Sequence, residues 1–215
     1  MKGKPRNHIL LATAIVEVRN KSGQYVPCRA LLDSGSQSHF ITERCAQRLR
    51  LPRTQTHTSI QDISNVNTST GHSVSIYLRS RHTDWHTTLD CAVLPNITGM
   101  TPATKLNTTD WKIPTDIKLA DEHFHEPGNI DLLIRADLFY EISHPGRRTR
   151  LGNYSVLQET VLGWTLAGRT PATTFRYCTT HISSTRRQQT GTQSQSLLGS
   201  GTSGAIHHDN RAEVL

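Results

Sequence analysis

The sequence predicts a mostly β fold, and three observations support this prediction. Runs that mix apolar and β-branched residues recur along residues 9–169, separated by turn residues such as Gly, Pro, Asn and Ser. Only two short segments have the apolar spacing of a helix. The length of 215 residues suits one domain with a tail, so we expect a single buried core.

The first predicted elements are a β-hairpin and a short helix. Residues 9–19 (ILLATAIVEVR) and 25–33 (YVPCRALLD) are candidate strands, and the turn residues NKSGQ join them. Thr42 can cap a helix within ITERCAQRLRL, and Pro52 would end it. One face of this helix would carry Ile41, Cys45 and Leu49.

The middle of the chain predicts further strands and a polar hairpin. Residues 54–71 are rich in Thr, Ser, Asn and Gln, which indicates a polar, mobile hairpin. Residues 73–78 (SVSIYL) alternate as a half-buried strand does, and residues 87–95 (TTLDCAVLP) are another candidate strand. Prolines and glycines interrupt residues 96–128, which we expect to form a long connection.

The C-terminal part predicts a strand, a helix and a last pair of strands. IDLLI (130–134) has the pattern of a short buried strand, ADLFYEI (136–142) has helical character, and residues 155–168 (SVLQETVLGWTLAG) suit two strands. Residues 170–215 are rich in Thr, Ser, Gln and Gly and have little apolar content. We therefore expect a folded domain at residues 8–169 and a disordered tail at residues 170–215.

The composition describes a polar, basic chain with a modest core: 34% hydrophobic residues, 19% charged residues and a net charge of +7. We expect the arginines to lie on solvated surface. A loop is expected to carry Arg147, Arg148 and Arg150. A nucleic-acid-binding module, suggested by the charge and by Arg186 and Arg187, is the less favoured alternative. Aromatic residues near the charge are scarce, and no recognition-helix or zinc pattern is present.

Neither a membrane span nor a signal peptide is expected. No stretch approaches the ~20 apolar residues that cross a bilayer, and the apolar N-terminal run soon carries Glu17 and Arg19. The widely spaced cysteines form no C-x-x-C pair, so neither a zinc knuckle nor a disulfide scaffold is indicated, and we expect a reducing, cytoplasmic location. These cysteines are Cys28, Cys45, Cys91 and Cys178.

The segment CRALLDSGSQSHFI ends an apolar run on Asp33, followed by Ser34 and Gly35. A carboxylate at the end of a buried strand is costly unless it is hydrogen-bonded, paired or protonated, so its placement suggests a function. Gly35 would let its N–H approach the carboxylate, and the Ser34 hydroxyl could brace the loop. Two such carboxylates about 3 Å apart share a proton, so one can activate water while the other polarises a peptide carbonyl. A surface turn closed by Asp and Gly would explain the tripeptide alone.

A family resemblance adds context to this tripeptide. The segment ALLDSGSQSHFITERCAQRL resembles the catalytic segment of retropepsin-type aspartic proteases, in particular the peptidase domain of BEL/Pao-type retrotransposon Pol polyproteins. DCAVLPNITGMTPA, WKIPTDIKLADEHFHEPGNIDLLIRADLFYEI and LQETVLGWTLAGR follow in the order that this family shows, so the resemblance covers about residues 8–169. It implies a closed, barrel-like β lobe with one or two short helices, in which IDLLI passes beneath the catalytic loop and Trp164 is a core aromatic.

The resemblance also implies a function. The catalytic aspartate would be Asp33, with Ser34 and Gly35 completing its loop. The candidate flap over a peptide substrate comprises Asn65, Val66 and Asn67. Because the chain holds one Asp-Ser/Thr-Gly sequence and no internal repeat, a symmetric homodimer must supply the second aspartate. The dimer would hydrolyse peptide bonds, in its own polyprotein, without a metal or an organic cofactor.

One position departs from the family pattern, which has a glycine where this chain has Arg135. A guanidinium that points inward could pair with Asp33 and hold it ionised, whereas one that points outward would cause only a local distortion. The flap sequence SNVNTSTGH also lacks a glycine-rich tip. The alternative is therefore a catalytically inactive retropepsin-like domain that acts in dimerisation or peptide binding.

A metal site at DEHFHE is a further alternative. Its donors would be Asp121, Glu122, His123, His125 and Glu126, with the two histidines alternating on one strand face. Nothing nearby completes a defined geometry, and we expect these histidines to be solvated. The tail holds a second, weaker group, His207, His208 and Asp209. Nucleophilic catalysis by cysteine is not expected, since no histidine partner is identifiable.

Overall fold

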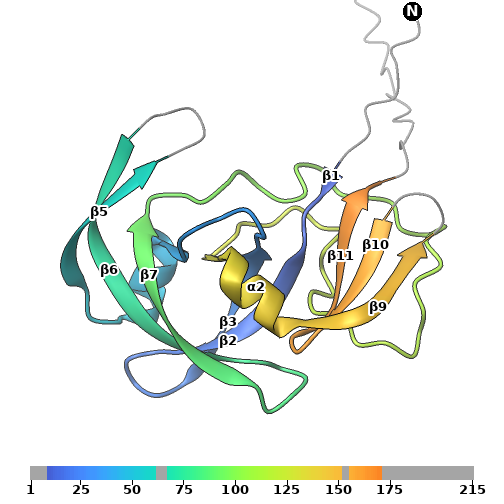
Figure 1. The fold of residues 1–215 in the computed structure, drawn as a ribbon, viewed down its shortest axis with the longest axis horizontal. Coiled ribbons are helices and arrows are strands. Elements are labelled where there is room, and N and C mark those ends of the chain that lie inside the picture. The colour runs from blue at the N-terminus through green and yellow to red at the C-terminus, as the bar shows by residue number, and fades with distance from the viewer. Residues whose placement is uncertain (1–8, 62–66, 152–154, 171–215) are drawn as a thin grey trace, which may run out of the picture. The chain divides into compact units, whose positions relative to one another are not determined.

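The structure is a computed structural model that describes residues 9–61, 67–151 and 155–170. Seven strands form one sheet, in the order β2 (Thr13–Arg19), β3 (Tyr25–Leu32), β8 (Leu132–Ile134), β4 (Phe40–Thr42), β7 (His86–Leu94), β6 (Asn67–Arg79) and β5 (Thr54–Gln61). A further pairing of β2 with β6 closes the first six of these strands into a barrel, which β5 extends (Figure 1). This topology confirms the predicted mostly β fold class, a closed barrel with two short helices among the described residues.

The first hairpin forms as the sequence predicts, with one correction. β2 and β3 pair in register from Thr13 opposite Leu31 to Arg19 opposite Tyr25. However, the strand predicted at residues 9–19 is divided. β1 (Ile9–Leu10) pairs with β11 (Gly163–Arg169) in a second sheet. The apolar run has no local signal for this break, because the partner of β1 lies at the other end of the domain.

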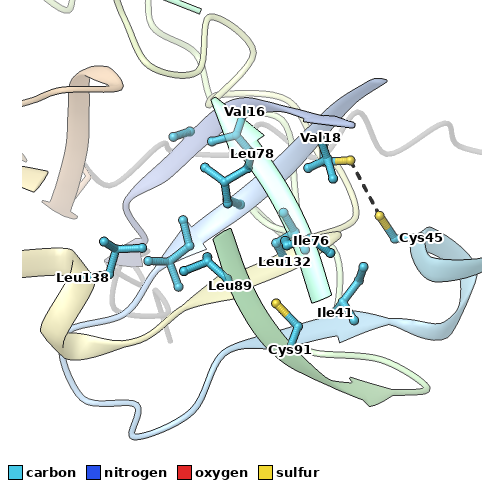
Figure 2. Packing of buried hydrophobic residues seen from close by; sticks show 14 of the residues in the cluster. Val16, Val18, Ile41, Cys45, Ile76, Leu78, Leu89, Cys91, Leu132 and Leu138 are labelled. Atoms are coloured by element: carbon cyan, nitrogen blue, oxygen red, sulfur yellow. Dashed lines mark hydrogen bonds between the residues drawn. The ribbon is translucent and has the colours of Figure 1, made fainter. Parts of the chain in front are cut away.

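Alternate side chains of the strands fill the barrel interior, together with helix residues such as Cys45 and Leu138 (Figure 2). On β2 the fully buried residues are Ala14, Val16 and Val18, whereas Ile15 and Glu17 between them are half-buried. β6 alternates in the same way through Val74, Ile76 and Leu78, which confirms the strand predicted at residues 73–78. Burial of one face of each strand fixes the register of strand pairing, since a slip of one residue would turn the apolar side chains toward solvent.

The first helix, α1 (Glu43–Leu49), begins where the sequence predicts. Thr42 is its N-cap, and the Thr42 hydroxyl accepts a hydrogen bond from the Cys45 N–H at 3.2 Å. The predicted buried face is confirmed by its residues Ile41, Cys45 and Leu49, all with no exposed surface. Arg50, at φ 54°, caps the C-terminus, so the helix ends before Pro52 rather than at it.

The second sheet has the order β1, β11, β10 (Ser155–Thr160) and β9 (Ser143–Leu151). The hairpin of β10 and β11 confirms the predicted last pair of strands. The prediction of a loop carrying arginines was wrong: β9 contains Arg147, Arg148 and Arg150. Its Pro and Gly favour a loop locally, but pairing with β10 satisfies the backbone instead. Trp164 of β11 packs as expected against a second core of Leu10, Leu106, Phe124, Leu157 and Leu166.

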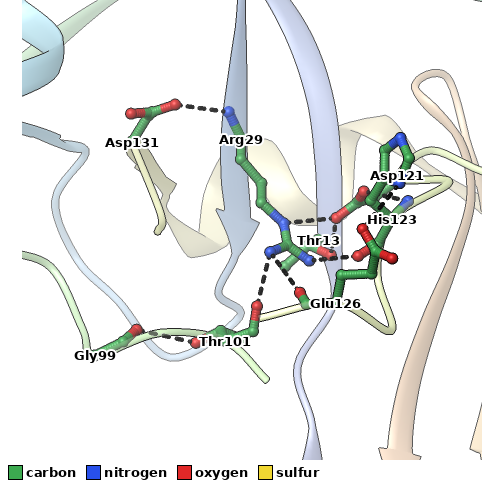
Figure 3. Close-up of polar contacts among 8 residues, drawn as sticks. All are labelled: Thr13, Arg29, Gly99, Thr101, Asp121, His123, Glu126 and Asp131. Carbon is green, nitrogen blue, oxygen red and sulfur yellow. Dashed lines mark hydrogen bonds and ion pairs between the residues drawn. The ribbon is translucent and has the colours of Figure 1, made fainter. Parts of the chain in front are cut away.

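The long connection before β8 is held on the barrel by Arg29 of β3 (Figure 3). The Arg29 Nε donates to the Asp121 carboxylate at 2.7 Å, and the Arg29 Nη1 donates to the Thr101 carbonyl at 2.7 Å. The Thr13 hydroxyl donates to the same Asp121 oxygen, also at 2.7 Å. This buried ion pair therefore ties a connection with little regular structure to two barrel strands.

The helices in the described part of the chain are too short and too polar to cross a bilayer.

Candidate active site

The Asp33 loop is held by backbone hydrogen bonds to the strand and helix of the second motif. β8 pairs with β3 in parallel, with Leu32 opposite Ile134. The Asp33 N–H donates to the Ile134 carbonyl at 2.9 Å, and the Ala136 N–H donates to the Ser36 carbonyl at 3.0 Å. Both ends of the loop are therefore fixed to the segment that leads from β8 into α2 (Ala136–Ile142). This arrangement is the one that the resemblance implies for IDLLI and the helix after it.

The Asp33 carboxylate is half-buried, and its Oδ1 accepts a hydrogen bond from the Gly35 N–H at 2.9 Å. A Cβ at Gly35 would lie 3.4 Å from this oxygen, so the glycine leaves space for the close approach. None of the ion pairs among the described residues includes Asp33. The carboxylate is therefore oriented by its own loop and carries no cationic partner within the described chain.

The serine that braces the loop is Ser36 rather than Ser34. Ser34 is exposed, and its hydroxyl makes no hydrogen bond within the described residues. The Ser36 hydroxyl instead donates to the Ser38 carbonyl at 2.9 Å. The expected brace fails because Ser34 lies at the exposed tip of the loop, whereas Ser36 lies where the chain turns back toward β4.

An apolar cluster that includes Leu31 adjoins the Asp33 loop and is separate from the barrel core. Its buried members are Leu31, Phe40, Ala92, Ile130 and Leu133, and Leu94 and Ile97 pack against them. Leu31 precedes Asp33 by two residues and lies opposite Leu133 in the β3–β8 pairing. The cluster is therefore connected to the Asp33 loop through Leu31 of β3.

His39 is a buried residue of this loop that the sequence reasoning did not single out. Only 7% of its surface is exposed, and its Nδ1 accepts a hydrogen bond from the Arg135 N–H at 3.2 Å. Burial, reinforced by the positive charge of Arg135, lowers the pKa of His39 below its usual value. A neutral imidazole therefore links the Asp33 loop to the second motif. Its only sequence signal is a histidine directly before the apolar pair Phe40 and Ile41.

Arg135 points away from Asp33 and forms a two-point ion pair with Asp137. The Nε and Nη2 atoms of Arg135 donate to the two Asp137 carboxylate oxygens at 2.7 and 2.6 Å. The guanidinium lowers the pKa of Asp137 to about 2, and the Leu138 N–H contributes to this shift. The backbone of Arg135, at φ −74° and ψ 172°, is extended and needs no glycine. Of the two orientations considered for Arg135, the outward one is found in the single chain.

The hairpin assigned to the flap is present as β5 and β6, with Gln61 opposite Asn67. Asn67 is the first residue of β6. Asn65 and Val66 lie outside the described residues, so the proposed flap tip stays a prediction.

The alternative of a metal site at DEHFHE is not supported, because the described residues do not bring its donors together. Residues 122–125 form a turn rather than a strand, so the two histidines do not share a strand face. Asp121 is held by Arg29 and Thr13, and Glu126 pairs with Lys105 at 2.8 Å. The tail group His207, His208 and Asp209 lies outside the described residues.

The sequence reasoning also missed a cluster formed by Cys28, Cys45 and Asp131, whose donor atoms lie within 4.8 Å of one another. Arg48 of α1 already provides a cation there, because its Nη2 lies 3.0 Å from the Asp131 carboxylate and 3.4 Å from the Cys28 sulfur. The spacing along the chain gives no signal for this group, since its members come from β3, α1 and the segment before β8.

Three comparisons with known proteins bear on the fold. No family model matches the chain. No curated protein matches it. Among solved structures, the chain is similar to the retroviral protease-like domain of Ddi1 from Leishmania major, with 10% sequence identity and a TM-score of 0.34. This similarity covers 76% of the present chain and 97% of that domain. At this identity and score it decides nothing about function, and the fold class depends on the sheet topology described above.

Proposed function

We propose that two copies of this chain form an aspartic endopeptidase in which the two Asp33 carboxylates share one proton. The observation that supports this most directly is the Asp33 loop itself. A carboxylate at the end of a barrel strand is oriented by the Gly35 N–H, its loop is bonded to β8 and α2, and no described cation neutralises it. A carboxylate held in this way is suited to meet a second one.

The mechanism requires both copies. One Asp33, ionised, takes a proton from a water molecule that attacks the peptide carbonyl, while the other, protonated, donates a hydrogen bond to the carbonyl oxygen. The chain contains one Asp-Ser-Gly sequence, so a symmetric dimer is the simplest source of the pair. Because one proton must stay on the dyad, the cleavage rate should peak at acidic to mildly acidic pH.

The substrate would be an extended peptide. The apolar cluster of Leu31, Phe40 and Leu133 beside the loop favours peptides with apolar side chains near the scissile bond. The β5–β6 hairpin would cover the peptide. We further propose that the substrate is the polyprotein of a BEL/Pao-type retrotransposon, that processing occurs in the cytoplasm, and that residues 170–215 are a tail outside the domain. The sequence resemblance supports these points.

The second candidate function is a catalytically inactive domain for dimerisation or peptide binding. Arg135 favours it, because it follows directly after Ile134, whose carbonyl binds the Asp33 N–H. A dimer could bring the Arg135 cation toward the pair of Asp33 carboxylates, even though Asp137 neutralises this cation in the single chain.

The test is cleavage of fluorescein-labelled casein by the purified chain between pH 4 and pH 8, with Asp33→Asn as the inactive variant. Asp84→Asn is the matched control, since Asp84 is an exposed carboxylate in the turn between β6 and β7. Activity that Asp33→Asn abolishes and Asp84→Asn retains supports the peptidase. A folded, dimeric wild-type chain without activity at any of these pH values supports the inactive domain.

A further inference from the structure

The thiols of Cys28 and Cys45 are in contact inside the barrel core. Their sulfur atoms lie 3.6 Å apart, and the dashed line that starts at Cys45 in Figure 2 marks this contact. Cys28 lies on β3 and is 1% exposed, and Cys45 lies on α1 with no exposed surface. Both are free thiols, and so is the buried Cys91 of β7. Two neighbouring thiols at this separation need only a small side-chain movement to form a disulfide.

A cation lies beside this pair. The Arg48 Nη2 lies 3.4 Å from the Cys28 sulfur and 3.7 Å from the Cys45 sulfur. The hydrogen bond from Cys45 lowers the pKa of Cys28, and the hydrogen bond from Arg48 adds to this shift. The same contact with Cys28 raises the pKa of Cys45, and burial raises it further. Of the two sulfurs, Cys28 also lies nearer to the Arg48 cation, at 3.4 Å against 3.7 Å, so Cys28 is the sulfur favoured to ionise.

We propose that Cys28 and Cys45 are a modification site, a thiol pair that a hydroperoxide such as hydrogen peroxide converts reversibly into a disulfide. The Cys28 thiolate attacks one peroxide oxygen, which breaks the O–O bond, releases hydroxide and leaves a sulfenic acid on Cys28. The Cys45 sulfur then attacks the Cys28 sulfur, and the sulfenic hydroxyl leaves as water with the Cys45 proton. In total, two thiols lose two hydrogen atoms and one peroxide becomes two waters.

The Arg48 side chain is 41% exposed and contacts both buried sulfurs, so it connects the thiol pair to the protein surface. The same arginine disfavours a metal ion at this group. Its guanidinium lies among the sulfurs and the Asp131 carboxylate, where a divalent ion would have to displace a cation from a buried carboxylate. Arg48 therefore supports thiolate chemistry rather than metal binding.

The disulfide would connect the two elements that flank the catalytic loop. Cys28 precedes Asp33 on β3, and Cys45 follows it on α1, so the new bond would enclose the loop within a short covalent ring. The inference goes beyond the proposed peptidase function and holds whether or not the dimer cleaves peptides. Its test accordingly measures the thiols and not cleavage.

The experiment treats the folded full chain with hydrogen peroxide, blocks the remaining thiols with iodoacetamide after unfolding, and maps the peptides by mass spectrometry. The expected product is a linked pair of peptides carrying Cys28 and Cys45, lighter than the two thiol peptides by two hydrogen atoms and restored by dithiothreitol. Cys91 is the internal control. Burial raises its pKa to about 12 and no thiol partner is recorded for it in the described residues, so it should be recovered alkylated.

Variants of two arginines test the role of the cation. Arg48→Gln should slow disulfide formation at neutral pH several-fold. Arg44→Gln is the matched control and should leave the rate unchanged, because Arg44 lies 3.6 Å from Asp131 and no contact with either sulfur is recorded for it. The wild-type peptide map keeps the test decisive even if Arg48→Gln does not fold.

Three results would overturn the proposal. The first is recovery of Cys28 and Cys45 in alkylated form at peroxide doses that oxidise a model dithiol. The second is linkage of either residue to Cys91 instead. The third is protection of both thiols from peroxide by stoichiometric zinc ion alone, which would establish a metal site.

Discussion

Replacement of Asp121 by alanine tests whether the buried ion pair with Arg29 holds the long connection on the barrel. The side chains of Asp121 and Arg29 are 1% and 10% exposed, so the pair is shielded from water. Removal of one partner of a buried pair costs about 3–5 kcal/mol, because the other charge stays buried without compensation. In Asp121→Ala the Arg29 guanidinium would keep only neutral carbonyl acceptors, from Thr101, Glu126 and His123. We therefore expect the free energy of unfolding to fall by about 4 kcal/mol.

Urea unfolding followed by tryptophan fluorescence measures this loss. Asp110→Ala is the matched control, since Asp110 is an exposed carboxylate of the same connection and should change stability by less than about 0.5 kcal/mol. The double variant Arg29→Met/Asp121→Leu removes both charges and should be more stable than Asp121→Ala. A loss below about 1 kcal/mol in Asp121→Ala, or a double variant that is no more stable than Asp121→Ala, would refute the reasoning.

Three further predictions concern the Asp33 loop and its surroundings. The pKa of His39 is lowered in the folded chain, so the free energy of unfolding should fall as the pH drops below about 6.5, the usual pKa of histidine. The reason is that the unfolded chain then binds a proton that the folded chain excludes. His39→Gln should remove this part of the pH dependence in urea unfolding. The Asp137 carboxyl should titrate near pH 2 by NMR and return toward its usual range in Arg135→Gly, and an unchanged midpoint would show that Arg135 does not cause the shift. Thr42→Ala should lower the free energy of unfolding by about 1 kcal/mol, because the helix loses its N-cap. Thr42→Ser keeps a capping hydroxyl and should lose much less stability, and thermal unfolding can measure both variants.

The sequence predicts those parts of the fold that local patterns encode. The alternation of apolar and polar residues along residues 73–78 predicts a strand with one buried face. The threonine before ERCAQRL predicts a helix start, because the first N–H groups of a helix need a hydrogen-bond acceptor. The place of Asp33 at the end of an apolar run was enough to identify the catalytic loop as a candidate. The structure confirms that the Gly35 N–H approaches the Asp33 carboxylate, whereas the catalytic role of Asp33 stays a prediction.

Other features depend on partners that are distant along the chain, so local patterns do not show them. Arg29 and Asp121 are 92 residues apart, and the contact of Cys28 with Cys45 depends on how α1 packs against β3. The arginines Arg147, Arg148 and Arg150 were expected in a loop, yet they lie in β9 despite Pro145 and Gly146 directly before them. The outward direction of Arg135 has a local cause, an aspartate in the first turn of α2 that can pair with it.

Catalysis by the proposed dimer needs Asp33 from two chains, and a mixing experiment tests this requirement most directly. Wild-type and Asp33→Asn chains are unfolded together in equal amounts, refolded at fixed total concentration and assayed for cleavage. If only dimers with two intact aspartates are active, random pairing leaves about one quarter of the wild-type activity. A value of about one half would mean that each chain acts alone, and it would contradict the shared dyad.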